Sequence, residues 1–194
     1  MRTWKRKGRG AGVRICSQLD PHEAELLASM VTSMCELLTE REQSAPRDDL
    51  ADLTGIRVGH VEAPRDATLG RLLPDFHRPD QDRELSADVV NGKLNAALRS
   101  VNEPKIIDAK LAAAQVVLDT LPSGGGDIAL TEDQAAGWLS ALNDVRLALG
   151  AMLGISEDIP DQLPPDHPHA AHLDVYHWLT VMQDLLVETL MTSR

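Results

Sequence analysis

Aromatic residues are scarce in this sequence of 194 residues, which has three tryptophans, one tyrosine and one phenylalanine. The core must therefore be built from Leu, Val, Ala, Ile and Met, a composition more typical of packed helices than of sheets. No run of about 18 uncharged apolar residues, the length needed to cross a bilayer, is present either. Because the basic start of the chain is not followed by the apolar core of a secretory signal, we expect a globular cytoplasmic protein.

Basic side chains are also few, 19 against 30 acidic ones, and their distribution is uneven. Six of them lie within residues 1–14, where there is no acid: Arg2, Lys5, Arg6, Lys7, Arg9 and Arg14. The rest of the chain carries 13 basic and 30 acidic side chains, a net charge of −17. Such a body repels nucleic acid and anionic membranes, so the sequence predicts that any phosphate contact is confined to these six cations.

Helical periodicity dominates the remaining sequence. Between Pro21 and Arg41 the apolar residues recur every three or four positions, which predicts an amphipathic helix with Asp20 as its N-cap. The same spacing returns after Thr131, which stands at the N-cap position of another helix that continues to Gly154.

Two further helical stretches carry features that affect packing. The stretch over residues 89–121 contains Pro104, which is expected to kink or split it. The last helix, predicted over residues 169–192, is apolar nearly all round, and such a helix must be buried on two sides. It is either the central helix of the domain or partly covered by a second copy of the chain, in a homodimer through residues 173–191.

Short extended stretches precede the helices that begin near Asp20 and Thr131. Residues 1–19 are interpreted as a basic β-hairpin around a glycine-rich turn, and the strand around residues 127–130 is a candidate to pair with it. Because side chains alternate along a strand, Cys16 is expected on the face opposite to Ile15 and away from the core.

Together these patterns predict a mainly α fold, a bundle of about four to five helices with a small antiparallel β element. We expect a single domain over residues 1–194. Within it, residues 42–90 form an irregular segment broken by proline and glycine, and residues 155–168 form an acidic, proline-rich linker.

The two cysteines, Cys16 and Cys35, are both candidate redox residues and are expected as free thiols in a cytoplasmic chain. The cations near Cys16 in the sequence are expected to raise its reactivity toward peroxide or a partner thiol; the alternative is an ordinary strand residue. Cys35 flanks the apolar stripe of its helix, which favours a structural role. Cys35 lies about 22 Å along the helix from the N-cap, which is too far for Cys16 to reach. We therefore expect a disulfide between Cys16 and another molecule rather than a Cys16–Cys35 bond within the chain.

Other residue types give weaker indications of chemistry. His167, His169 and His172 are closely spaced, but a metal site needs further ligands, and we expect neither a metal nor a cofactor. Arg146 falls within the apolar stripe of its helix, where we expect it to pair with a carboxylate. No catalytic triad, paired-carboxylate motif or nucleotide-binding loop is evident, so an enzyme is not expected.

Six short stretches resemble a known family. They are Met1–Arg6, Asp20–Ala24, Leu53–Ile56, Arg71–Asp75, Leu142–Gly150 and Val175–Thr180, of which the part from Asn143 to Gly150 is the most specific. Through them the sequence is similar, over essentially its whole length, to an actinobacterial protein family catalogued as a domain of unknown function. The family includes a mycobacterial regulator of transcription that responds to oxidative stress.

This resemblance implies a redox-responsive transcriptional regulator that acts with an alternative sigma factor of RNA polymerase on genes of cysteine synthesis and redox buffering. The residues constrain how such a regulator could work, because no helix-turn-helix with a DNA-reading second helix is evident. We therefore expect a protein partner, a sigma factor or RNA polymerase, and only weak DNA contact through the N-terminal hairpin. The alternative is a non-enzymatic adaptor or scaffold without DNA contact.

Overall fold

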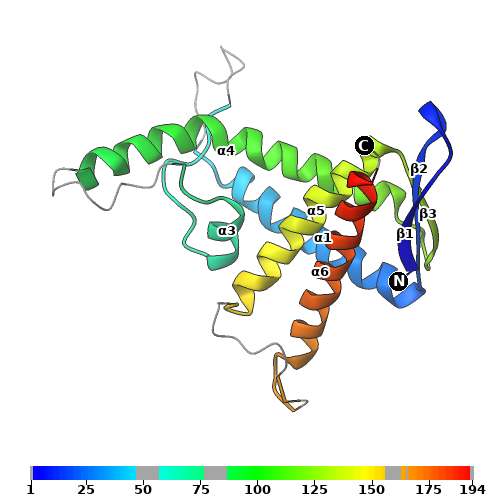
Figure 1. The fold of residues 1–194 in the computed structure, drawn as a ribbon. Coiled ribbons are helices and arrows are strands. Elements are labelled where there is room, and N and C mark those ends of the chain that lie inside the picture. Colours follow the sequence, from blue (N-terminus) through cyan, green and yellow to red (C-terminus); the bar gives the residue numbers. More distant parts are fainter. Residues whose placement is uncertain (1, 47–56, 77–86, 156–162, 165, 193–194) are drawn as a thin grey trace. The chain divides into compact units, whose positions relative to one another are not determined.

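A computed structural model describes the chain except for residues 1, 47–56, 77–86, 156–162, 165 and 193–194 (Figure 1). The elements follow in the order β1 (Arg2–Lys7), β2 (Arg14–Leu19), α1 (Pro21–Gln43), α3 (Ala67–Leu72), α4 (Ala87–Thr120), β3 (Gly126–Leu130), α5 (Glu132–Met152) and α6 (Ala170–Met191), with a single turn of 3-10 helix at Gly10–Gly12. The mainly α fold with a small antiparallel sheet is confirmed. No helix in the described part of the chain is long and apolar enough to cross a membrane.

The chain divides into two compact units. The first contains Met1–Cys35 and Lys110–Arg194, and the second contains Glu36–Ala109. Helices α1 and α4 each contribute residues to both units. The single domain expected over residues 1–194 stays a prediction.

A three-stranded antiparallel sheet with the strand order β1-β2-β3 lies in the first unit. This confirms the hairpin and its pairing with the third strand. Alternation along β2 buries Ile15 and Leu19 and leaves Cys16 half-buried on the opposite face. Helix α5 contacts β2 and β3 and helix α6 contacts β1, so these two helices cover the buried face (Figure 1). We call the opposite face, which carries Cys16, the outer face.

The predicted caps fix where the helices after β2 and β3 begin. Asp20 accepts a hydrogen bond from the Glu23 backbone N–H at 2.9 Å, and the Glu23 carboxylate accepts one from the Asp20 N–H at 2.9 Å. Thr131 and Gln134 form the same reciprocal pair at the start of α5. In the turn before β3, Gly125 has φ +81°, and a Cβ atom there would lie 2.6 Å from the Asp20 carbonyl carbon. The turn at Gly124–Gly126 is therefore closely packed against Asp20 and brings β3 beside β2.

Two tryptophans form the centre of the first unit's core. Trp138 of α5 is fully buried and donates its indole N–H to Thr120 Oγ1 at 2.7 Å. Trp4 of β1 is 3% exposed, and its ring meets that of Trp138 edge to face at 5.7 Å between centroids. This contact joins residues near the start of the chain to α5 and holds β1 against the helices.

Within one chain, helix α6 is buried along one face, so burial on two sides would require the homodimer contact. Its buried residues are Leu173, Leu179, Met182 and Leu186. On other sides of the helix, Val181 is 52% exposed and Met191 is 72% exposed. Because α6 packs on α5 and β1 at the edge of the unit, it is not the central helix. A homodimer contact through residues 173–191 stays a prediction.

Helix α4 continues through Pro104 and is not split there. Proline has no backbone N–H, so the carbonyl of Ser100, four residues earlier, loses its usual helical donor. The backbone N–H of Gly59 replaces it, at 2.7 Å from the Ser100 oxygen. A Cβ atom at Gly59 would lie 2.9 Å from the Pro104 ring, so this approach requires glycine.

A buried ion-pair network lies inside the second unit. Arg99 and Glu103 are each 1% exposed, and the Arg99 Nη1 donates to Glu103 Oε2 at 2.8 Å. Arg41 Nε donates to the other oxygen of Glu103 at 2.8 Å. Arg99 also donates to Asp75 Oδ1 at 2.8 Å and to the carbonyl of Leu73 at 3.0 Å. Two cations therefore share the Glu103 carboxylate, an arrangement that replaces the hydrogen bonds these groups lose to water on burial.

A second, exposed network lies on the surface of the same unit. Arg57 donates hydrogen bonds to the carboxylates of Asp108 and Glu42. The hydrogen bond and negative charge of Asp108 raise the pKa of the Arg57 guanidinium above its ordinary value, so its charge persists at every physiological pH.

Candidate functional site

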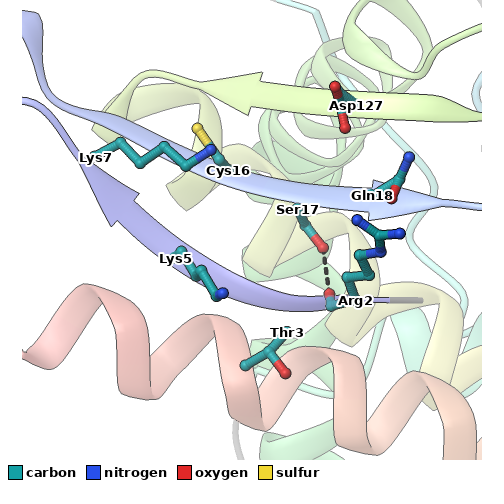
Figure 2. A pocket seen from close by; sticks show the side chains of 8 residues that line it. All are labelled: Arg2, Thr3, Lys5, Lys7, Cys16, Ser17, Gln18 and Asp127. Carbon is teal, nitrogen blue, oxygen red and sulfur yellow. Dashed lines mark hydrogen bonds between the residues drawn. The ribbon is translucent and has the colours of Figure 1, made fainter.

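A pocket of about 400 Å³ opens on the outer face of the sheet, and Cys16 contributes to its wall (Figure 2). We call it the outer-face pocket. Its lining residues are Arg2, Thr3, Lys5, Lys7, Cys16, Ser17, Gln18 and Asp127. They come from all three strands, so the pairing of the sheet determines which side chains meet here.

The register of β1 against β2 places cations next to the thiol. Lys5 lies directly opposite Cys16, and Lys7 lies opposite Arg14, one position diagonal to Cys16. Residues paired in this way have Cβ atoms about 4.5–5.5 Å apart and share one face of the sheet. On β3, Ala129 lies opposite Cys16 and adds no charge.

An irregularity in β1 sets which side chains face outward. The register shifts by one residue between Arg2 and Lys5, as in a β-bulge. After the shift Trp4 is buried, whereas Lys5 is exposed on the outer face. Where the ladder is interrupted, the Ser17 hydroxyl donates to the Arg2 carbonyl at 2.5 Å. The bulge therefore positions both the core tryptophan and the lysines around Cys16.

The structure separates the six basic residues that the sequence grouped together. Arg2, Lys5 and Lys7 line the outer-face pocket, and none of the ion pairs found in the described part of the chain involves them. Arg14 lies on the same face, in β2. Arg6 lies opposite Ile15 and forms an ion pair with Glu132 of α5 at 2.6 Å. Arg9 is exposed at the turn.

The pocket has the features needed to attract anions to a thiol. Among its lining residues Asp127 is the one acid, against three cations. Cys16 is half-buried and free, so small molecules in the pocket can reach its sulfur. A concave surface lined with one sign of charge raises the local concentration of oppositely charged ligands.

Cys35 lies in a different setting, because it is a half-buried residue of α1 and does not line the outer-face pocket. Like Cys16, it takes part in no disulfide in the described part of the chain. The structure thus places only one of the two candidate redox residues among the cations.

Arg146 does not have the predicted carboxylate partner among the described residues, which corrects that expectation. Its Nη2 donates to the amide oxygen of Asn143 at 3.4 Å. The carboxylate two residues earlier, Asp144, is buried and accepts a hydrogen bond from Lys110 Nζ at 2.5 Å instead. Arg146 belongs to the stretch from Asn143 to Gly150 that carries the most specific part of the family resemblance. At the end of this stretch, a Cβ atom on Gly150 would lie 3.3 Å from the Tyr176 ring. Within residues 143–150, Gly150 therefore permits close packing against Tyr176, and Asp144 forms a buried ion pair with Lys110.

The histidine cluster lies at the start of α6. The His167 and His169 rings are 5.6 Å apart, and the His169 and His172 rings are 6.2 Å apart. The backbone N–H of His169 donates to His167 Nδ1 at 3.2 Å, which orders the entry to the helix. Within the described ranges, no three His, Cys, Asp or Glu side chains are grouped so as to hold a metal ion.

Comparison with known proteins gave both a family and named relatives. The family described as "Domain of unknown function (DUF2017)" matches residues 1–190. Proteins named "Oxidative stress regulator AosR" from Mycobacterium bovis and Mycobacterium tuberculosis are 52% identical over 196 residues, covering 100% of this chain and 90% of theirs. A "Putative oxidative stress regulator AosR" from Mycobacterium leprae is 48% identical over 195 residues with the same coverage. The comparison with solved structures found no match.

Proposed function

The chain belongs to the DUF2017 family, and we propose that it is an oxidative-stress regulator that detects oxidants through the Cys16 thiol of the outer-face pocket. The observation that carries this proposal is the position of Cys16, half-buried among Arg2, Lys5 and Lys7 on a sheet face that α5 and α6 leave uncovered. Reactive cysteines in proteins occupy such accessible, electropositive surroundings.

We further propose that the output is regulation of transcription through a protein partner, a sigma factor or RNA polymerase, and that the protein is not an enzyme. The charge distribution supports a protein partner over direct DNA binding, because the chain beyond residue 14 has a net charge of −17 and makes a poor surface for DNA. Direct phosphate contact is assigned to the outer face of the sheet. We also propose that the regulated genes are those of cysteine synthesis and redox buffering, and that the protein is located in the cytoplasm.

The test measures binding to purified RNA polymerase holoenzymes, each carrying one sigma factor, before and after peroxide treatment. We expect peroxide to change the affinity of the wild-type chain for one of them several-fold. Cys16→Ser should remove the change, and Cys35→Ser, which alters the cysteine outside the pocket, should retain it. A Cys16→Ser variant that responds to peroxide like the wild type would contradict the proposal.

A further inference from the structure

We propose that Cys16 is a site of S-thiolation by small anionic disulfides, with the cations of the outer-face pocket binding the carboxylates of the incoming molecule. The inference rests on the proposed function in assigning the oxidant response to the same thiol. It adds the chemical class of the reagent and the reversible modification that results.

The size of the pocket suits such a ligand. Its volume of about 400 Å³ lies in the range of small-molecule sites, which is about 300–1,000 Å³. Half of a disulfide formed by a short peptide can occupy it while the other half stays in solvent. Gln18 and Thr3 add polar side chains to the wall, which can hydrogen-bond to peptide groups.

The charge of the pocket selects the sign of the ligand. Lys5 lies directly across the strand pair from Cys16, Lys7 is its diagonal neighbour, and Arg2 lines the other end of β1. None of the ion pairs in the described part of the chain engages these three cations. A carboxylate that approaches Cys16 therefore meets three cations against one acid, Asp127, whereas a cationic reagent is repelled.

The position of the second cysteine favours a mixed disulfide as the product. The chain has two cysteines, and Cys35 does not line the pocket. A mixed disulfide at Cys16 therefore meets no second thiol of its own chain in the pocket that could displace the small-molecule half. The mixed disulfide persists and protects the sulfur from irreversible oxidation.

The step is thiol–disulfide exchange. Cys16 releases its proton to solvent, and its sulfur attacks one sulfur of the small disulfide RS–SR. A bond forms between Cys16 and one RS group while the original S–S bond breaks. The other half leaves as RS⁻ and takes up a proton. The Cys16 thiol is oxidised and the departing half is reduced, so the small disulfide is the oxidant.

The experiment compares three disulfides that differ in charge: oxidised glutathione, which is anionic, bis(2-hydroxyethyl) disulfide, which is neutral, and cystamine, which is cationic. Rates of adduct formation at Cys16 are measured at low salt by mass spectrometry with peptide mapping. Each rate is divided by the rate for the same chain unfolded in urea, which removes differences in intrinsic reactivity. We expect this normalised rate to be about tenfold or more higher for oxidised glutathione than for cystamine.

Two variants test whether the pocket causes this selectivity. Lys5→Ala/Lys7→Ala should reduce it strongly, and 0.5 M salt should reduce it in the wild type because salt at about that concentration screens charges. Lys93→Ala/Lys105→Ala removes the same charge from exposed positions of α4 and should leave it unchanged. Circular dichroism confirms that each variant is folded, and Cys16→Ser should give no adduct at this position.

Equal normalised rates for the three disulfides, or a selectivity that survives Lys5→Ala/Lys7→Ala, would overturn the inference. Peroxide oxidation of the same samples separates this failure from that of the proposed function. If peroxide oxidises Cys16 but the disulfides show no charge selectivity, the inference fails and the proposed function stands. If the selectivity is present but peroxide leaves Cys16 reduced, the proposed function fails instead.

Discussion

At the scale of single residues, the environment of Cys16 depends on a contact that is remote in sequence. Alternation along β2 was enough to predict that Cys16 faces away from Ile15. It was not enough to predict which cations would surround the thiol. That depends on the bulge in β1, which turns Trp4 into the core against Trp138 and leaves Lys5 opposite Cys16. No local pattern near Trp4 marks that bulge.

Arginine ion pairs also show that contacts between distant segments are hard to predict from the sequence. Its position in an apolar stripe predicts a carboxylate partner for Arg146, but in the described structure the arginines that share a buried carboxylate are Arg99 and Arg41. Arg99 is held by Asp75 and by carbonyl oxygens of Leu73 and Pro74, which come from a segment about two dozen positions earlier. Contacts of this kind cannot be obtained from helical spacing.

The Glu103 carboxylate gives a prediction at this scale. Glu103→Ala removes the shared partner of Arg41 and Arg99 and leaves the buried Arg99 with the half-exposed Asp75 as its remaining ion-pair partner. We expect the free energy of unfolding, measured by urea denaturation, to fall by about 3–5 kcal/mol. Glu40→Ala, an exposed acid of the same helix as Arg41, should change it by less than about 0.5 kcal/mol. Equal effects of the two substitutions would show that the network does not stabilise the fold.

At the scale of elements, local signals predicted the helices well where caps are present. The Asp20 and Thr131 caps mark the starts of α1 and α5, because the cap side chain satisfies backbone donors that the helix leaves free. Pro104 does not split α4, because Gly59, a residue of another segment, donates to the carbonyl that the proline leaves without a helical donor. The central position considered for helix α6 is wrong, because its apolar composition alone does not show which of its side chains pack against other elements.

The outer strand β1 carries a prediction about DNA. Lys5→Ala/Lys7→Ala should weaken association with double-stranded DNA at low salt, because both lysines are exposed and unpaired in the described structure. If both contact phosphates, the slope of log K against log salt should become smaller in magnitude by about 2. Fluorescence anisotropy measures both quantities.

Two control variants belong to that measurement. Arg6→Ala should have little effect, because Arg6 already pairs with Glu132. Lys93→Ala/Lys105→Ala, which matches the loss of charge on α4, should also bind DNA as the wild type does. If Lys5→Ala/Lys7→Ala binds DNA normally as well, the outer face is not a phosphate-binding surface and the adaptor without DNA contact is favoured.

At the scale of the whole molecule, the division of charge was evident from the sequence and the division of structure was not. The excess of cations in residues 1–14 follows from counting side chains. The two compact units depend on which distant segments pack together, and the second unit is formed by residues between the two parts of the first. The sheet joins the N-terminal cations to β3, more than a hundred residues later in the chain, so the candidate site contains residues from both parts of the first unit.

The central claim is that Cys16, rather than Cys35, is the thiol that responds to oxidants. Mass spectrometry with peptide mapping after brief treatment with limiting peroxide, in the presence of a reagent that traps sulfenic acid, tests it most directly. The pocket cations and the exposure of the outer face predict that Cys16 is modified first and that Cys35 stays largely reduced. Modification of Cys35 while Cys16 remains a thiol would contradict the account.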